Sequence, residues 1–373
     1  MRLHLTAIAL AMLGLLAAGP VRAQDITIAT ASPLTGTCAQ DGNAIKNGAV
    51  LAAEIINSKG GINGRKIKVI SEDDRSDPKE AATLANKLTN DKDVIAVIGH
   101  YNSSCTLAGH PIYARGHLLE LSPASTSPAI SVEGAKPNSF LARTIITDAD
   151  QGDFVAKWMV KDRGFKKVAV LWENDDYGLG LKEVMEKRVP AYGGQCVAVE
   201  SYYMGETKDF RPILTKVRGL NPDCIFIGGL YNEAALVAKQ ALDMGWKPLI
   251  FGTDGIFSPA LVKLGGPAVE GMMFSGIFLS DAPIPIVQEY SKAYQAKFNI
   301  EPSEFDAYSY DAMLVIAECI KKGGATRDGV WGQIHSVKVP GVTGLNVFNA
   351  SGDVVKDSIK MEVQNAKIVL AAK

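Results

Sequence analysis

The chain has 373 residues, with 39 Lys and Arg against 40 Asp and Glu, so its formal net charge is −1. This balance argues against a nucleic-acid partner, whose phosphates would need a basic face. The length exceeds what one hydrophobic core usually organises, so two domains are expected. Five cysteines are too few, and odd in number, for a fold held together by disulfides.

The first 23 residues have the parts of a secretory signal peptide. Arg2 supplies the positive start, residues 5–16 form a mostly apolar core, and Val21-Arg22-Ala23 is a small-x-small cleavage site. No cysteine directly follows the cleavage site, which argues against a lipid anchor, and no later stretch has the roughly 20 apolar residues of a membrane helix. We therefore expect a soluble, periplasmic, monomeric protein of 350 residues with a net charge of −3, because Arg2 and Arg22 are removed.

In the first part of the mature chain, short β-rich runs alternate with segments of helical length. The runs are 26–32, 66–73, 94–99 and 117–123. Between the first two, Ile45, Ala49, Ala52, Ala53 and Ile56 fall on one face at helical spacing. This alternation predicts an open α/β sheet whose strands pair in parallel through right-handed crossovers.

The same pattern then starts again, which predicts a second sheet of the same design. The second set of runs is 168–173, 196–201, 224–229, 249–254 and 272–277. Two helical segments, 286–298 and 305–322, follow it. The remainder, 344–370, is typical of short antiparallel strands, with turns at 349–352 and 364–365. The fold class is therefore α/β with two mostly parallel sheets.

In open α/β sheets, ligands bind beyond the carboxyl ends of strands, where loops enter helices. Five polar loops occupy such places: HYNSSCT (100–106), SPASTSPA (122–129), ENDDYGLG (173–180), GGLYNEAA (228–235) and GTDGIF (252–257). These loops are where we expect the functional side chains.

Hydroxyl groups in two of these loops suit a carboxylate. Ser103, Ser104, Ser125 and Thr126 offer donors without a lysine, and helix N-termini favour anions. Helix capping alone would also explain Ser103 and Thr126.

The second sheet offers groups that suit an ammonium. Asp254 supplies a carboxylate, and Tyr177 supplies an aromatic ring with a hydroxyl. Turn formation before Gly255 and loop packing are the alternatives for these two residues. Donors on one domain and acceptors on the other would together clamp a free α-amino acid.

Catalysis is not expected. The chain has no G-x-S-x-G turn, no serine with a recognisable His and Asp partner, and no G-x-x-x-x-G-K-[ST] phosphate loop. His100 and His110 lack metal-ligand spacing, so we interpret them as structural and expect neither a metal nor a cofactor.

Nine motifs in order resemble the periplasmic branched-chain amino-acid-binding proteins, over nearly all of the mature chain. They are SPLTG (32–36), NSKGGINGRKI (57–67), DDRSDPKEA (73–81), IGHYNSSCT (98–106), SPASTSPA (122–129), TDADQG (147–152), DYGLG (176–180), FGTDG (251–255) and YSYDA (308–312). The resemblance implies a type I periplasmic-binding-protein fold with a three-segment hinge. The lobes would be 25–146 plus 278–345, and 147–277 plus 346–373.

The resemblance also implies roles for particular residues. Ser103, Ala124 and Thr126 would hold the ligand carboxylate, partly through backbone groups, and Tyr177 and Asp254 would stand at the ammonium. The further candidates in or beside the site are Tyr101, Asn102, Tyr231, Asp41 and Asp306. The implied function is capture of a free amino acid, branched-chain or of broad specificity, for an ABC permease. A ligand sensor with the same fold is the alternative.

Three features depart from the better-known relatives. Asp41 and Asp306 replace aromatic residues, and the relatives' cysteine pair falls at Ser76 and Asn102, so a Cys38–Cys105 bridge is the candidate replacement. If both acids line the cleft, the ligand side chain should be polar or cationic, because buried charge does not tolerate methyl groups alone. If both face solvent or cap helices, an aliphatic ligand fits, and the family resemblance favours that case.

Overall fold

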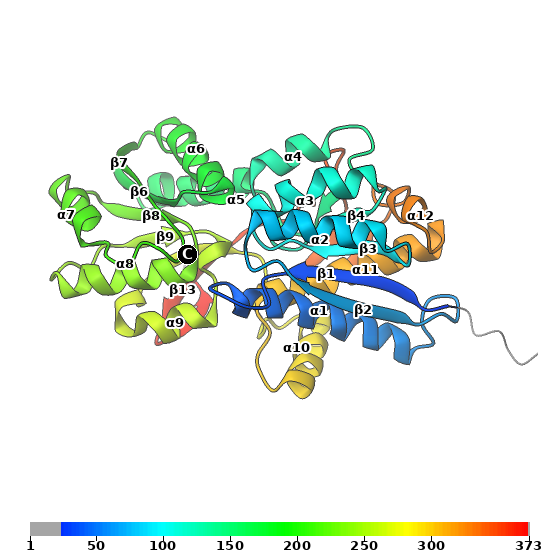
Figure 1. Ribbon diagram of the computed structural model, residues 1–373. Helices are drawn as coiled ribbons and strands as arrows, with labels where there is room; N and C mark the ends of the chain where they lie inside the picture. The colour runs from blue at the N-terminus through cyan, green and yellow to red at the C-terminus, as the bar shows by residue number, and fades with distance from the viewer. Residues whose placement is uncertain (1–23, 372–373) are drawn as a thin grey trace, which may run out of the picture.

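The computed structural model describes residues 24–371, so the predicted signal peptide lies outside the described residues. Two lobes lie side by side, as Figure 1 shows, and several segments connect them. Each lobe is built on one sheet. The first sheet has the strand order β2-β1-β3-β4-β5 and the second β14-β13-β10-β9-β8-β6-β7.

The first sheet is wholly parallel, with neighbouring strands in the order of a doubly wound sheet. Its strands are β1 (Ile26–Ser32), β2 (Ile67–Asp73), β3 (Val94–Gly99), β4 (Leu119–Ser122) and β5 (Leu141–Arg143). Its helices are α1 (Ala39–Ser58), α2 (Pro78–Asn90), α3 (Ser103–Arg115) and α4 (Pro128–Gly134), joined later in the chain by α10 (Pro285–Phe298), α11 (Glu304–Gly323) and α12 (Arg327–Trp331). The predicted strands in this half form, and β5 is an additional strand.

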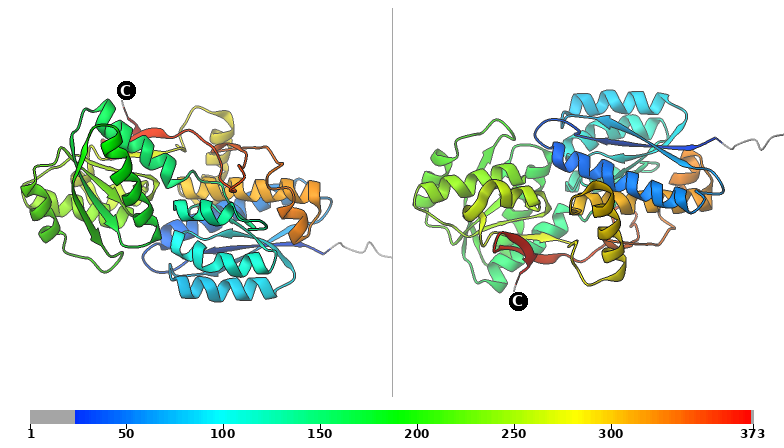
Figure 2. Two further views of the ribbon diagram at one scale, coloured as in Figure 1. Left: turned by 90° about the horizontal axis from the view of Figure 1, so that it is seen from above. Right: turned by 90° about the horizontal axis from the view of Figure 1, so that it is seen from below.

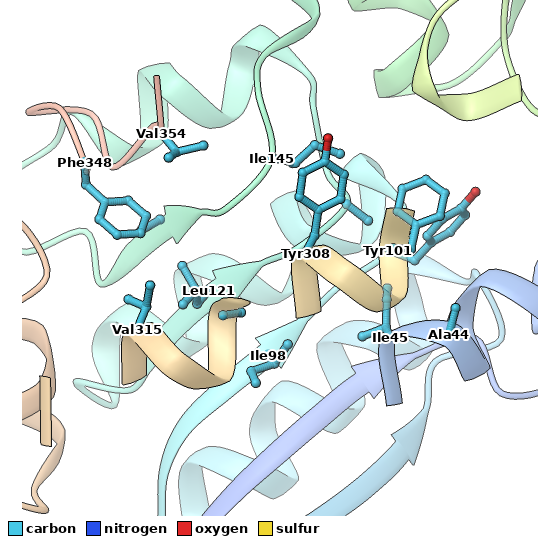
Figure 3. Close-up of a cluster of buried hydrophobic side chains, with 14 of the residues drawn as sticks. Ala44, Ile45, Ile98, Tyr101, Leu121, Ile145, Tyr308, Val315, Phe348 and Val354 are labelled. Carbon is cyan, nitrogen blue, oxygen red and sulfur yellow. The ribbon is translucent and has the colours of Figure 1, made fainter. Parts of the chain in front are cut away.

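Alternate residues of β1 pack on opposite faces of this sheet, as the period of a strand requires. Ile28 belongs to a core with Ile45 of α1 and Ile316 of α11, whereas Ala29 packs with Leu88 of α2. Helices therefore cover both faces. Figure 3 shows part of the larger core, in which α11 contributes Tyr308 and Val315.

The second sheet is parallel except at one edge. Its strands are β6 (Lys167–Glu173), β7 (Gln195–Tyr202), β8 (Cys224–Gly228), β9 (Ile250–Gly252) and β10 (Met273–Gly276), followed by the antiparallel β13 (Ile359–Gln364) and β14 (Lys367–Leu370). Its helices are α5 (Asp148–Lys157) with a π-helical end (Trp158–Asp162), α6 (Asp176–Ala191), α7 (Arg211–Gly219), α8 (Tyr231–Asp243) and α9 (Pro259–Gly265), with 3-10 turns at Asp254–Ile256 and Gly266–Val269.

The C-terminal antiparallel strands occur as predicted. β13 and β14 form a hairpin, and Phe348 pairs with Val354 around the turn at 349–352. A second small hairpin pairs β11 (Val339–Gly341) with β12 (Gly344–Asn346).

The chain passes between the lobes three times, so each lobe combines segments that are distant in the sequence. β5 belongs to the first sheet and β6 to the second, α11 packs on α1, and β13 returns to the second sheet. In Figure 2 the orange helices accordingly lie in the blue and cyan lobe, while the red hairpin lies in the green lobe. The alternation of strands and helices predicted the two successive sheets, but it did not predict this exchange of later segments between the lobes.

Polar side chains join the connecting segments. The ammonium of Lys356 donates to the carbonyl of Thr144 (2.9 Å) and to the hydroxyl of Thr343 (2.6 Å), so it links two of the three crossings. Burial lowers the pKa of Lys356 to about 8. Among the described residues, no helix is long and apolar enough to span a membrane.

Candidate functional site

A small cavity lies between the two lobes, at the carboxyl ends of their strands. Its volume is about 20 Å³, room for about one water molecule. The lining residues are Tyr101, Asn102, Ser103, Ala124 and Phe305 from the first lobe, and Tyr177, Leu230, Asp254 and Gly255 from the second. Each of the five polar loops singled out by the strand pattern supplies at least one lining residue; 122–129 supplies only Ala124, and 173–180 only Tyr177.

The lobes are in contact around this cavity. Nε2 of Gln40 donates to the hydroxyl of Ser258 at 3.0 Å, and the backbone N–H of Asp176 donates to the hydroxyl of Ser104 at 3.3 Å. These bonds join α1 to the start of α9 and α3 to α6. The arrangement is therefore the closed one, in which both lobes can contact one small ligand.

The first lobe presents donors at the start of helix α3. Asn102 stands at the N-cap, but its side chain makes no capping bond and its buried Oδ1 has no hydrogen-bond partner. The hydroxyl oxygen of Ser103 accepts from the backbone N–H of Ser127 at 3.2 Å, which leaves its proton free to donate. Capping of α3 therefore does not account for Asn102 or Ser103.

Ala124 and Thr126 lie in the loop before α4. The N–H of Ala124 makes a long bond to the hydroxyl of Ser122, at 3.3 Å. Thr126 is buried beside the cavity rather than in its lining, and its Oγ1 has no hydrogen-bond partner. Ser127, not Thr126, caps helix α4, so the capping interpretation fails for Thr126 as well.

The second lobe presents an acceptor and an aromatic hydroxyl. The Tyr177 hydroxyl lies 2.9 Å from Oγ1 of Thr253 and 3.3 Å from Oδ1 of Asp254. The same Oδ1 accepts from the N–H of Gly255 at 2.9 Å, so Asp254 both forms the turn and faces the cavity. Burial raises the pKa of Asp254 to about 6, although hydrogen bonds from Gln151, Gly255 and Tyr177 counteract it.

Glycine is required at position 255 by a close approach. A Cβ atom there would lie 2.4 Å from the Tyr177 hydroxyl and 2.7 Å from the carbonyl oxygen of Gly229. Any side chain at 255 would displace the hydroxyl that contacts Asp254, so this glycine preserves the geometry of the site.

Three sequence candidates lie behind the lining rather than in it. Asp41 is 1% exposed and accepts a hydrogen bond from the Tyr101 hydroxyl at 2.9 Å. Tyr231 is also buried, and the charge of Asp41 is among the causes that raise its pKa. Asp306 is 2% exposed, but it closes a capping box with Ser303 at the start of α11. The prediction that both acids face solvent is wrong, whereas helix capping does explain Asp306.

The sequence reasoning missed Leu230, Phe305 and Glu304. The better-known relatives carry an aromatic residue at the position of Asp306. In this chain the aromatic residue of the lining is Phe305, one position earlier. Glu304 is fully buried beside Phe305. Leu230 lies within a loop that the strand pattern had singled out, but its apolar side chain gave no chemical signal.

The predicted Cys38–Cys105 disulfide does not form, since all five cysteines are free thiols. The sulfur of Cys38 packs 3.5 Å from the sulfur of Met204 in the other lobe, and Cys105 is buried in α3. Burial raises the pKa of both thiols far above the usual range, so neither is a reactive thiolate.

The histidines interpreted as structural have structural partners. Nδ1 of His100 lies 2.6 Å from Oδ2 of Asp74, with both side chains fully buried, and Nε2 lies 3.3 Å from the Tyr113 hydroxyl. His110 is buried in α3, 3.8 Å from Glu133.

Two α/β lobes that close on a small polar cavity define a ligand-capturing protein. Comparison with known proteins agrees: the periplasmic binding protein family matches residues 25–367, and the chain belongs to this family. It is therefore a non-enzymatic solute-binding protein of the ABC-transporter type, and membership implies a periplasmic or extracellular location.

Individual relatives cover most of the chain. An amino acid binding protein of Pseudomonas aeruginosa is 32% identical over 91% of this chain and 90% of its own length. The Leu/Ile/Val-binding protein homolog 1 of Brucella suis is 34% identical over 81% of this chain and 79% of its own. The leucine binding protein LivK of Thermotoga maritima superposes with a TM-score of 0.86 at 29% identity, over 93% of this chain and 98% of that one.

Proposed function

We propose that the protein captures a free α-amino acid between its lobes in the periplasm, after cleavage of the signal peptide, and delivers it to an ABC permease. The proposal rests on one observation: Ser103 of the first lobe and Asp254 of the second line the same cavity. A hydroxyl donor on one side and a carboxylate on the other match the two charged groups that all α-amino acids share.

Three residues would hold the ligand's carboxylate, and two would hold its ammonium. Ser103 and Thr126, with backbone N–H groups near Ala124 and the start of α3, would bind the carboxylate. Asp254 and Tyr177 would bind the ammonium. The names of these relatives, which specify leucine, isoleucine and valine, support an amino acid and, taken alone, favour a branched-chain or broad range.

Closure is the mechanism that we propose for capture. The lobes would be 25–146 plus 278–345 and 147–277 plus 346–373, rotating about the three connecting segments. A ligand that bonds to both lobes favours the closed state, because its affinity for that state is higher. Interlobe bonds such as Gln40 to Ser258 would then form only in the closed state that the permease recognises.

A screen of the twenty amino acids by calorimetry and thermal unfolding tests the proposal. A bound ligand at about 100 times its dissociation constant should add about 2.7 kcal/mol to the free energy of unfolding. Ligands without a carboxylate or without an amine, such as sugars and simple amines, should produce no shift. A shift caused only by those controls would contradict the proposal.

Delivery to a permease requires a separate measurement. Uptake of the amino acid found in the screen should fall in cells that lack this protein and return when it is supplied. Normal uptake with loss of a transcriptional response to the ligand would instead favour the sensor alternative.

Affinity should depend on pH through Asp254. Its pKa is raised to about 6, and the ammonium requires the ionised carboxylate, so binding displaces a proton below pH 6. Tyr177, Asp148 and Glu304 also face this carboxylate. Burial and the charge of Asp254 raise the pKa values of Asp148 and Glu304 as well. We expect the dissociation constant to rise about fivefold from pH 6 to pH 5, measured by calorimetry. An unchanged constant would show that no carboxylate ionises on binding.

A further inference from the structure

One buried carboxyl group lines the interlobe cavity and three more lie behind its lining, and each comes from a different element. They are Asp41 in α1, Asp148 in α5, Asp254 in the 3-10 turn and Glu304 in α11, and none is more than 2% exposed. Within residues 24–371, none of the four forms a salt bridge with Lys, Arg or His. Buried carboxylates without counter-charges are costly, so the cavity favours a ligand that brings positive charge.

Among these four acids, Glu304 is the clearest candidate for binding a cation. It is fully buried, and no described side chain donates a hydrogen bond to either of its carboxylate oxygens; its one favourable contact is with the backbone of Ile277. It belongs to the first lobe, yet its Oε2 lies 3.5 Å from the place of a Cβ on Gly276 in the second. An unpaired carboxylate therefore stands between the lobes, next to the cavity-lining Phe305.

Two of the other acids are neighbours of Glu304. After burial, the negative charges of Asp254 and then Asp41 are the causes that raise the pKa of Glu304. Glu304 thus lies near both Asp254, which suits an α-ammonium, and Asp41, which lies behind the ring of Tyr101. A single ammonium at Asp254 leaves Glu304 and Asp41 without compensation.

The closed cavity has room for about one water molecule, so a ligand would enter while the lobes are apart, and the aromatic rings that it then meets suit a long stem. Tyr101 and Phe305 line the cavity as an edge-to-face pair with ring centroids 5.2 Å apart, and the Tyr101 hydroxyl donates to Asp41. Figure 3 shows Tyr101 and Tyr308 with their hydroxyls directed away from the core. Methylene groups can pack on such rings while a terminal cation reaches the acids behind them.

We propose that the ligand is a basic α-amino acid whose side-chain cation is bound by Glu304 and Asp41. The inference rests on the proposed function and names the ligand class for the same site. Asp254 remains the partner of the α-ammonium, and Glu304 and Asp41 determine specificity at the other end. A branched aliphatic side chain would leave both of those carboxylates facing methyl groups.

Matched ligand pairs test the proposal on the intact protein. Lysine and norleucine differ only in the terminal amine, and arginine and citrulline differ in the charge of the terminal group. We expect the cationic member of at least one pair to bind about tenfold or more tightly at neutral pH, by calorimetry. Equal or tighter binding of norleucine, leucine or a neutral amide overturns the proposal.

Variants test which residues cause the preference for a cationic ligand over its neutral partner. Glu304→Gln and Asp41→Asn should each reduce the preference for the cation over its neutral partner about tenfold, while leaving norleucine binding equal or tighter. Glu289→Gln, on the exposed face of α10, is the matched control and should change neither ligand. An unaltered preference in both site variants overturns the assignment, and the wild-type comparison decides the ligand class even if a variant fails to fold.

The two proposals fail in different ways. If no amino acid binds, the proposed function itself is wrong. If leucine or norleucine binds as tightly as lysine or arginine, capture of an amino acid stands and only the basic ligand class is wrong.

Discussion

Replacing Arg143 with Met is expected to lower the free energy of unfolding by about 3–5 kcal/mol, because it leaves a buried charge without its partner. Arg143 is fully buried at the end of β5. Its Nε lies 2.7 Å from Oδ1 of Asp353, and its Nη1 donates to the carbonyls of Ser125 (3.2 Å) and Ser127 (3.0 Å). With the Ser131 hydroxyl, to which Nη2 donates, four acceptors would lose this donor at once.

The location of Arg143 gives the same substitution a second effect. Ser125 and Ser127 flank Thr126 in the loop that we expect to hold the ligand carboxylate, and Asp353 lies in the third connecting segment. Arg143 therefore fixes the loop of the first lobe against the hinge. A variant that still folds should bind its ligand more weakly as well.

Urea unfolding with a matched control measures the effect. Arg188 pairs with Asp153 at a similar distance, 2.8 Å, but both side chains are substantially exposed. Arg188→Met should therefore cost about 1 kcal/mol or less. Equal losses of unfolding free energy in the two variants would show that the buried Arg143–Asp353 pair matters no more to stability than an exposed pair. Adding Asp353→Leu to Arg143→Met should restore part of the loss by removing the unpaired charge.

The sequence predicted most strands because each is short, apolar and bounded by polar loops. β5 was missed because three residues, Leu-Ala-Arg, carry no measurable period, and its place in the sheet depends on pairing with β4. The exchange of segments between lobes could not be found from alternation, since the apolar face of α11 would suit either sheet. Only the family resemblance implied it.

Site residues in the loops that follow strands could be predicted from the sequence. Those in the first turn of a helix were harder to predict, because the start of the helix decides which side chain faces the cavity. Ser303 and Asp306 form the capping box that fixes where α11 begins, which places Phe305 rather than Asp306 in the lining. The spacing of Ser303 and Asp306 was a usable signal for that cap. Glu304 had no signal, because acids in the first turn of a helix are usually exposed and favoured there by the helix dipole.

Replacing Asp254 with Asn is expected to weaken amino-acid binding about tenfold to a hundredfold, which corresponds to loss of one charge-assisted hydrogen bond, about 1.5–3 kcal/mol. Asn keeps the shape of the side chain and can still accept from the Gly255 N–H and the Tyr177 hydroxyl. The loss would therefore come from the charge that opposes the ligand's ammonium and not from a collapsed loop.

Stability should change in the opposite direction, which separates this effect from misfolding. The pKa of Asp254 is raised to about 6 in the folded protein from an ordinary value of 3.8, so its ionisation costs stability as the pH rises from about 4 to 6. Above pH 6, Asp254→Asn should therefore leave the unliganded protein as stable as the parent or more stable. Asp243→Asn, on the exposed end of α8, should change neither affinity nor stability. Parental affinity in the Asp254 variant would remove this residue from the site, and a loss of stability that matched the loss of affinity would make its role structural.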